Sequence, residues 1–478
     1  MGRMATQVGW AATVIWLVGS VAAGAQDVAV KQYADGSVYE GQFLNGRPHG
    51  TGTYRLPDGF EYTGTWVEGE IRGQGQARYP NGAIYEGGFA AGKPEGRGKI
   101  TISDGTAYDG DWADGQRTGE GVQTYPGGAV YTGGMVKGLA HGKGVFVDPS
   151  GARYDGDWVE GRKTGRAMIT YPNGARYDGD VVDGVLQGQG TLVMPDGLTY
   201  VGAWADGQMQ GRGKLTQPNG DLYEGEFAGG LRDGKGSVTY ADGSRYEGDF
   251  RADRRHGKGR FETRDGMIYE GDWQDGRIAG QGRKTHPDGA AYDGSFAADQ
   301  PHGKGRMVWP DGTRYEGEWF EGVIEGKGRS DLADGSTYEG DFRAGQRHGT
   351  GVLSRPDGYR YDGAWVDGRR EGTGVATYAD GSRYEGPFRA DLREGTGKLV
   401  WPDGYVYDGT FVGGVATGAG VARWPSGDVY EGEFLDGRPH GVGVARYAGG
   451  QEARGTWKNG LLTAPAPAPA AASETTGN

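Results

Sequence analysis

The stretch "DGSVYEGQFLNGRPHGTG", residues 35–52, contains the pattern that decides the fold. Tyr39 is followed by a glycine two residues later and by an aromatic residue, Phe43, four residues later. An Asn-Gly pair comes next, and Gly50 and Gly52 close the stretch. Side chains at even offsets share one face of a β-strand, and Asn-Gly is a hairpin turn signal. The stretch therefore predicts a β-hairpin with a face made of aromatic residues and glycines.

The same pattern recurs every 23 residues along the chain. Eighteen tyrosines keep this register without an insertion, and we number each repeat from its tyrosine, which is position 0. These tyrosines are Tyr39, Tyr62, Tyr85, Tyr108, Tyr131, Tyr154, Tyr177, Tyr200, Tyr223, Tyr246, Tyr269, Tyr292, Tyr315, Tyr338, Tyr361, Tyr384, Tyr407 and Tyr430. A half-repeat follows at Ala453, where Gly455 and Trp457 keep the pattern. Such a fixed period indicates an array of units that pack against their neighbours.

The spacing inside each repeat indicates strands, because its period is two and not 3.6. Position 0, the glycine at +2 and the aromatic residue at +4 share one face, and the acidic residues at +1 and +3 share the other. A Gly-x-Gly pair occupies +11 and +13, and an Asp-Gly or Asn-Gly pair closes the repeat. We therefore predict an all-β chain that forms an elongated, curved and twisted single-layer antiparallel sheet of tandem 23-residue hairpins. Rings would lie over the strand glycines and pack between strands.

The composition limits the classes of function. Glycine accounts for 100 of 478 residues, hydrophobic content is 35%, and aromatic content is 11%, which is high for a disordered chain. The formal net charge of -13 argues against a nucleic-acid partner, because phosphate binding needs a basic surface. The chain has no cysteine, which excludes disulfides and thiolate metal sites.

The N-terminal segment resembles a secretory signal peptide. An apolar run from about Val8 to Ala22 follows Arg3, and Ala-Gly-Ala precedes Gln26, so we predict a signal peptide at residues 1–25. An uncleaved anchor is the alternative, although the run is shorter than the about 20 residues of a spanning helix. We therefore expect export to the periplasm or cell surface of a bacterium.

The rest of the chain divides into an array and a tail. We predict that the repeat array occupies residues 26–462. Residues 463–478 are rich in proline and alanine and then polar, which predicts a disordered tail.

The repeat, written Y-E-G-x-[FW]-x-x-G-x-x-H-G-x-G, resembles the MORN repeat. The segment "YEGEFLDGRPHGVG", residues 430–443, is close to its consensus, and the resemblance covers about Val28 to Gly460. The resemblance implies a curved, elongated sheet of hairpins and a role in scaffolding, dimerisation or partner binding. Lipid binding is also attributed to the family. Some MORN proteins carry a kinase or methyltransferase domain, but no part of this sequence matches one, so the resemblance implies no catalytic residue here.

The histidines and acidic residues do not predict a metal site. Six histidines lie at +10, never in consecutive repeats, so the nearest pairs are about 19 Å apart at the usual strand spacing. They are His49, His141, His256, His302, His348 and His440. The acidic row at +1 and +3 is interpreted as a solvated face, because Ca²⁺ needs a compact set of oxygens. A G-x-x-x-x-G-K match ending at Lys235 lacks the following Ser or Thr of a phosphate-binding loop.

We therefore predict a non-enzymatic scaffold or interaction protein with no cofactor, no metal and no catalytic residue. It would bind a protein partner or self-associate through the repeat array, and the alternative is membrane-lipid or glycan binding through the aromatic face. The candidate interaction surface consists of the recurring tryptophans at +4. They are Trp66, Trp112, Trp158, Trp204, Trp273, Trp319 and Trp365.

Overall fold

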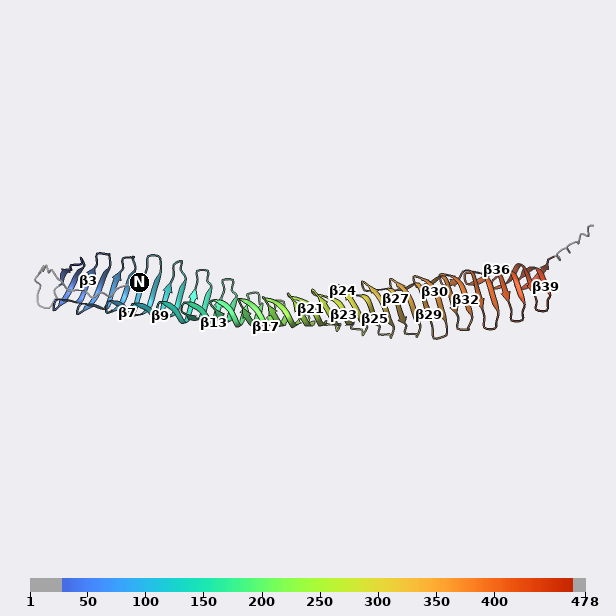
Figure 1. The fold of residues 1–478 in the computed structure, drawn as a ribbon, viewed down its shortest axis with the longest axis horizontal. Helices are drawn as coiled ribbons and strands as arrows, with labels where there is room; N and C mark the ends of the chain where they lie inside the picture. The colour runs from blue at the N-terminus through green and yellow to red at the C-terminus, as the bar shows by residue number, and fades with distance from the viewer. Residues whose placement is uncertain (1–27, 467–478) are drawn as a thin grey trace, which may run out of the picture. The chain divides into compact units, whose positions relative to one another are not determined.

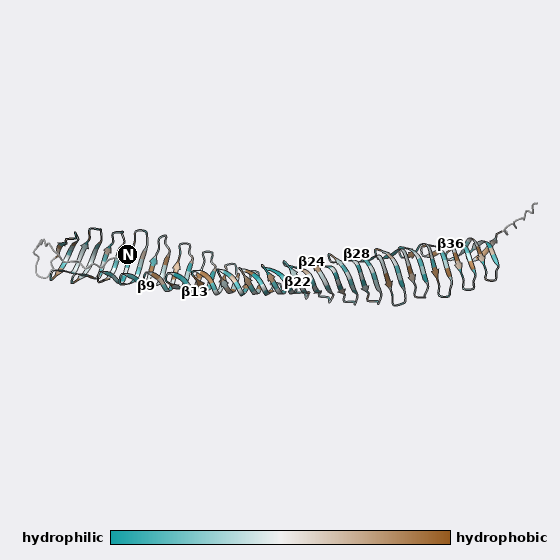
Figure 2. Cartoon of the chain, in the orientation of Figure 1, coloured by the Kyte–Doolittle hydropathy of each residue, from teal (hydrophilic) through white to brown (hydrophobic). Residues whose placement is uncertain are grey.

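The computed structural model describes residues 28–466, which contain strands and turns but no helix. The predicted signal peptide and most of the predicted tail lie outside these residues. The chain divides into two compact units, residues 1–241 and 242–478, and each is described by itself. In Figure 1 the strands of each unit follow one another in chain order. Figure 2 shows hydrophilic and hydrophobic residues interspersed along these strands, without a long hydrophobic block.

Each repeat contributes a first strand of seven residues, centred on the Tyr-x-Gly-x-aromatic pattern, and a second strand that carries Gly-x-Gly. The first strands of unit 1 are β2 (Val38–Leu44), β4 (Glu61–Val67), β6 (Ile84–Ala90), β8 (Ala107–Ala113), β10 (Val130–Val136), β12 (Arg153–Val159), β14 (Arg176–Val182), β16 (Thr199–Ala205) and β18 (Leu222–Ala228). Its second strands are β1 (Val28–Gln32), β3 (Arg47–Arg55), β5 (Glu70–Arg78), β7 (Lys93–Thr101), β9 (Gln116–Thr124), β11 (Leu139–Val147), β13 (Arg162–Thr170), β15 (Val185–Val193), β17 (Gln208–Thr216) and β19 (Leu231–Thr239).

Unit 2 repeats the same alternation. Its first strands are β20 (Arg245–Arg251), β22 (Ile268–Gln274), β24 (Ala291–Ala297), β26 (Arg314–Phe320), β28 (Thr337–Arg343), β30 (Arg360–Val366), β32 (Arg383–Arg389), β35 (Val406–Val412), β37 (Val429–Leu435) and β39 (Glu452–Lys458). Its second strands are β21 (Arg254–Glu262), β23 (Arg277–Thr285), β25 (Gln300–Val308), β27 (Val323–Asp331), β29 (Gln346–Ser354), β31 (Arg369–Thr377), β33 (Leu392–Arg393) with β34 (Gly395–Val400), β36 (Val415–Arg423), β38 (Arg438–Arg446) and β40 (Leu461–Pro465).

Within each unit, consecutive strands pair antiparallel, so each unit is a single open layer of hairpins. In the first hairpin Tyr39 lies opposite Tyr54 and Gly41 opposite Gly52, and the next pairing places Gly52 opposite Gly64. The glycines at +2 and +13 therefore form one row across neighbouring strands. The predicted fold class, an all-β antiparallel sheet of tandem 23-residue hairpins, is confirmed.

The second strand of each repeat contains a bulge. In the first repeat the pairs Gly41–Gly52 and Phe43–Pro48 leave one residue of β2 opposite three residues of β3, with Gly50 among them. Gly50 has a φ of 78°, a left-handed conformation that glycine adopts without strain. A bulge bends its strand and increases the local twist. The first glycine of Gly-x-Gly is therefore required by backbone conformation and the second by close packing.

Two kinds of turn connect the strands. The hairpin tip at +6 and +7 has positive φ at both residues, 50° at Asn45 and 76° at Gly46, as a type I′ turn requires. In the connection to the next repeat, the Asp58 carboxylate accepts a hydrogen bond from the Phe60 N–H at 3.0 Å. Each tip is also tied to its neighbour, because the Gly69 N–H donates to the Pro48 carbonyl at 2.8 Å. These contacts fix the spacing of successive tips.

One second strand is interrupted. Pro387 occupies +3 of its repeat, a position that pairs with +10 in other repeats, as Asp249 does with His256. The Glu394 N–H donates to the Pro387 carbonyl at 3.0 Å, but proline has no N–H for the reciprocal bond, and the strand divides there into β33 and β34. At the C-terminus, β40 continues to Pro465, so part of the predicted tail is paired with β39.

Candidate interaction surfaces

The tyrosines at position 0 form the interior of each unit. All eighteen are between 0% and 4% exposed. Each hydroxyl donates a hydrogen bond to the backbone carbonyl three residues later, as Tyr200 does to Ala203 at 2.8 Å. The ring covers the glycine row so closely that a Cβ added to Gly213 would lie 2.5 Å from the Tyr200 ring. The glycines therefore leave the space in which the tyrosine rings pack, as predicted from the sequence.

The buried tyrosines should make the fold sensitive to alkaline pH. Burial raises the pKa of Tyr200 from its ordinary value of 10 to about 12, and it raises the pKa values of Tyr62 and Tyr315 to about 12 as well. A raised tyrosine pKa means that the stabilisation is complete below about pH 10 and is lost as the pH rises through the folded value. Ultraviolet titration should therefore show most tyrosines ionising near pH 12 together with loss of β-structure. Ionisation of most tyrosines near pH 10 with the sheet intact would contradict this expectation.

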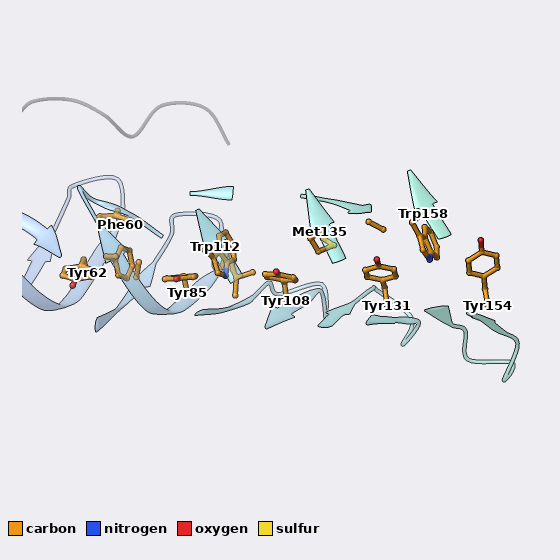
Figure 3. Close-up of a cluster of buried hydrophobic side chains, with 14 of the residues drawn as sticks. Phe60, Tyr62, Tyr85, Tyr108, Trp112, Tyr131, Met135, Tyr154 and Trp158 are labelled. Carbon is orange, nitrogen blue, oxygen red and sulfur yellow. The ribbon is translucent and has the colours of Figure 1, made fainter. Parts of the chain in front are cut away.

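The seven tryptophans predicted as an interaction surface lie in the same interior. They are 2–8% exposed, and each indole N–H donates to the carbonyl of the +13 glycine in the preceding repeat, as Trp365 does to Gly351 at 3.0 Å. Figure 3 shows Trp112, Met135 and Trp158 on one side of this interior, with a row of tyrosines on the other. A role of these tryptophans in partner binding stays a prediction, and their burial does not favour it.

The rings of the interior form a continuous series. Tyr62 packs edge-on against Trp66 of its own repeat, with centroids 5.7 Å apart, and against Phe89 of the next repeat, at 4.9 Å. Edge-to-face pairs of this kind add stabilisation beyond the area that they bury. Most repeats therefore contact the next repeat through the same pair of rings, and the series is interrupted at Met135 and Val181, which take the place of the +4 ring.

The acidic residues at +3 have a structural role that the sequence analysis did not identify. The Asp157 carboxylate accepts a hydrogen bond from the Arg166 N–H at 3.1 Å, within the bulge of its own repeat. Its hydrogen bond to the Lys143 ammonium, at 2.6 Å, is the main cause that lowers the pKa of Asp157. The same carboxylate-to-backbone contact recurs at Asp111, Asp180, Glu226, Asp249, Asp272, Glu318 and Asp341.

Three of the histidines at +10 accept a hydrogen bond from the backbone of the next repeat, whereas the buried Nδ1 atoms of His141 and His440 have no hydrogen-bond partner in the described chain. The His348 Nδ1 accepts a hydrogen bond from the Asp367 N–H at 3.4 Å, and His49 and His256 make the equivalent contact. In other repeats a glutamate takes this place, as Glu371 does for the Ala390 N–H at 2.8 Å. Within residues 28–466 no group of three or more His, Asp or Glu side chains could hold a metal ion. The +10 position therefore links one repeat to the tip of the next.

An exposed row of apolar side chains follows the hairpin tips of unit 1. Position +5, the residue before the type I′ turn, is apolar in nine successive repeats, and we name these residues the tip row. The tip row is Leu44, Val67, Ala90, Ala113, Val136, Val159, Val182, Ala205 and Ala228. Its large members are 37–53% exposed, with Val182 the most exposed. Successive members are about 9.6 Å apart, which is two strand spacings.

Unit 2 has a different exposed feature on the opposite turns. The rings of Trp401 and Tyr405 are 4.8 Å apart, and those of Tyr405 and Trp424 are 5.4 Å apart, all half-buried. A cavity of about 330 Å³ lies beside Trp424 and is also lined by Tyr447 and Trp457. We name Trp401, Tyr405, Trp424 and Tyr447 the C-terminal aromatic group. Tyr447 is 43% exposed, so part of this group is accessible to a ligand.

A comparison with known families assigns the repeats. The model of the MORN repeat matches eighteen consecutive segments, from residues 39–60 to residues 430–452. The chain belongs to the MORN repeat family. The tyrosine-over-glycine interior and the bulged second strand are thus features of eighteen MORN repeats and of the half-repeats that flank them. None of the curated proteins compared with the chain matches it.

Solved structures show weaker likenesses. The TCP domain of SAS-4 from Drosophila melanogaster, solved with a proline-rich motif of Ana2, is 12% identical, with coverage of 37% of this chain and 90% of that chain and a TM-score of 0.22. The TCP10 domain of CPAP from Danio rerio, solved with a STIL peptide, is 18% identical, with coverage of 57% and 98% and a TM-score of 0.14. Virginiamycin B lyase from Staphylococcus aureus is 10% identical, with coverage of 68% and 90% and a TM-score of 0.11. At these TM-scores the likenesses support no conclusion about function.

Proposed function

We propose that this MORN repeat protein is a non-enzymatic scaffold that binds a protein partner along the tip row of unit 1. The observation that carries the proposal is the unbroken run of nine apolar residues at +5. Seven of the nine are exposed, and exposed apolar side chains gathered along one edge are typical of interaction sites. The interior aromatic residues are buried, so the tips and the charged outer face are the surfaces that unit 1 offers to a partner.

Unit 2 shows that the fold itself does not require apolar tips. Position +5 of unit 2 is mixed: it is arginine at Arg251, Arg343 and Arg389, all exposed, and apolar at Ala297, Phe320, Val366, Val412 and Leu435. A charged residue is thus compatible with the same type I′ turn and the same pairing. The apolar character of the tip row is therefore better explained by contact with a partner than by folding. The regular spacing would let many weak contacts add along one partner.

We further propose that the protein acts in the bacterial cell envelope. The support is the sequence of residues 1–25, with one early arginine, an apolar run and a small-residue cleavage motif. Within residues 28–466 no helix is long and apolar enough to cross a membrane.

Binding through the tip row can be tested by substituting its valines with arginine, which unit 2 carries at +5 in three repeats. In a chain with Val136→Arg, Val159→Arg and Val182→Arg, we expect capture of the envelope partner by proximity labelling to fall at least about tenfold, because interface centres exclude charge. The matched control carries Val366→Arg, Val412→Arg and Leu435→Arg at the same position of unit 2. Circular dichroism should show both variants folded. Equal capture by the two variants would exclude the tip row as the binding surface.

The second candidate function is binding of a glycan or a lipid surface, and the C-terminal aromatic group favours it. Its neighbouring, partly exposed rings beside a cavity are the kind of surface on which a sugar ring packs. Co-sedimentation of the same preparations with cell-wall material and with liposomes separates the candidates. Pelleting that is lost in a Trp424→Ala chain and kept in the tip-row variant would favour this second function.

A further inference from the structure

The cavity beside Trp424 has a cause in the sequence of its repeat. Eight repeats precede a tryptophan at +4 of the next repeat, and seven of them carry a large side chain at +15. These seven side chains are Tyr54, Ile100, Phe146, Leu192, Phe261, Met307 and Leu353. Phe146 and Phe261 pack against the tryptophan that follows, with ring centroids 6.3 and 6.2 Å apart. The eighth repeat has Ala445 before Trp457, and both residues line the cavity of about 330 Å³, so the missing large side chain leaves this space open.

Two other repeats show which chemical group packs on the equivalent tryptophan. The Cζ atom of Arg255 lies 4.1 Å from the centroid of the Trp273 ring, and that of Arg347 lies 4.4 Å from the Trp365 ring. Both arginines occupy +9 of the repeat that precedes the tryptophan. A cation over an aromatic ring is attracted by the negative charge of the ring face. The repeat that lines the cavity has Pro439 at +9, which supplies no cation.

A carboxylate without a cationic partner also lines the cavity. Asp428 lies at the turn that Trp424 begins, and the Trp424 N–H donates to the Asp428 carbonyl at 2.9 Å. The carboxylate accepts hydrogen bonds from the Ala448 N–H and the Ser426 hydroxyl, both at 2.8 Å, and these bonds lower the pKa of Asp428. No lysine, arginine or histidine of residues 28–466 forms an ion pair with it. The cavity therefore combines aromatic walls with a negative charge that is free to bind a cation.

We propose that this cavity binds an arginine side chain of a protein partner, with the guanidinium packed on the aromatic lining and hydrogen-bonded to the Asp428 carboxylate. A guanidinium suits both parts of the lining, because its flat face packs on an aromatic ring while its N–H edge donates to a carboxylate. One contact of this kind is weak, so the arginine belongs to a partner whose other contacts add to it. The inference goes beyond the proposed function, because the cavity is in unit 2 and the tip row is in unit 1.

Saturation-transfer NMR with the full-length chain tests the chemistry of the occupant. The probe is N-acetyl-arginine amide, and the matched control is N-acetyl-citrulline amide, which keeps the shape of the side chain but lacks its charge. We expect saturation of the protein to reach the arginine probe, and the citrulline probe to bind at least about tenfold more weakly. Equal binding of the two probes, or no binding of the arginine probe at millimolar concentration, would overturn the inference. Binding of cellobiose with no binding of the arginine probe would also overturn it and would favour the second candidate function.

Substitutions test whether the arginine probe binds in this cavity. Ala445→Leu fills the cavity with a residue that other repeats carry at +15, and Asp428→Asn removes the charge. Each should weaken binding of the arginine probe at least about tenfold. Asp221→Asn is the matched control, because Asp221 also lies two residues before its tyrosine and accepts a hydrogen bond from the Ala241 N–H at 2.8 Å.

Circular dichroism should show that these three variants keep the β-structure. Unchanged binding in Asp428→Asn or in a folded Ala445→Leu chain would exclude the cavity as the arginine site, as would an equal loss in Asp221→Asn. The scaffold function is tested separately, because the tip-row variants leave every residue of the cavity unchanged.

Discussion

A Tyr200→Ala chain is expected to lose local stability of about 3–5 kcal/mol in the hairpins around β16, which is the range for removing a buried aromatic side chain. Tyr200 is 0% exposed, and its ring packs against Trp204 at 5.2 Å and Phe227 at 5.1 Å. Its removal also leaves the glycine row beneath it uncovered. Tyr200→Phe keeps the ring and loses the hydroxyl hydrogen bond, so about 1 kcal/mol is expected.

Hydrogen exchange should report this loss, because long repeat arrays do not unfold in one cooperative step. Amides of β15 to β18 should lose protection in Tyr200→Ala, whereas amides several repeats away keep theirs. Tyr125→Ala is the control, since Tyr125 lies at a turn and is 39% exposed. Equal effects at Tyr125 and Tyr200 would show that the tyrosine row does not hold the repeats together.

The second large effect is expected for a side chain added to the glycine row. In Gly213→Val the new Cβ would lie 2.5 Å from the Tyr200 ring, so the ring must move or the strands must separate. Overpacking of this kind costs about 1–3 kcal/mol, and exchange in β16 and β17 measures it. Gly449→Ala is the matched control, because no atom lies within 4 Å of its added Cβ and its φ is not positive.

The chain contains one natural example of such a side chain. Ala167 holds the +13 position of its repeat, and its tyrosine, Tyr154, is 4% exposed whereas most others are fully covered. An Ala167→Gly chain is therefore a useful companion, because it restores the pattern of the other repeats. No gain in exchange protection around β12 and β13 in that chain would argue against ring–glycine contact as the source of the Gly213→Val effect.

Much of the fold could be predicted from the spacing of a few residues. The 23-residue register of Tyr39 and its equivalents, the alternation of Gly41 and Phe43, and the Asn45–Gly46 turn each specify a local geometry that the structure repeats. These residues are sufficient to predict the fold because an antiparallel hairpin pairs strands that are adjacent in the sequence. The same spacing could not reveal how completely Trp66 and its equivalents are buried, which depends on their packing against the preceding repeat, where the Trp66 ring contacts Tyr39 and its N–H donates to the Gly52 carbonyl.

Two features were not predicted from the sequence, the hydrogen bonds of the +3 carboxylates and the tip row, and the structure shows which sequence positions indicate them. The Asp157 carboxylate accepts a hydrogen bond from the Arg166 N–H, which lies in the bulge of the second strand. The spacing of residues in the sequence does not predict a bulge. The tip row could have been found by aligning position +5, which is apolar at Leu44 and Val182 but arginine at Arg343. Position +5 lies outside the Tyr-Gly-aromatic pattern that decides the fold, so that pattern does not indicate it.

The hydrogen bonds between successive hairpin tips give unit 1 a constant spacing from one repeat to the next. A contact such as that between Gly69 and Pro48 allows one fixed step per repeat, and the absence of insertions keeps every step equal. Distance along the unit is therefore counted in whole repeats. Deleting one complete repeat would move all later side chains by one step of about 9.6 Å and return each to the same face. Gain or loss of repeats thus changes the reach of the unit without redesign of its surface.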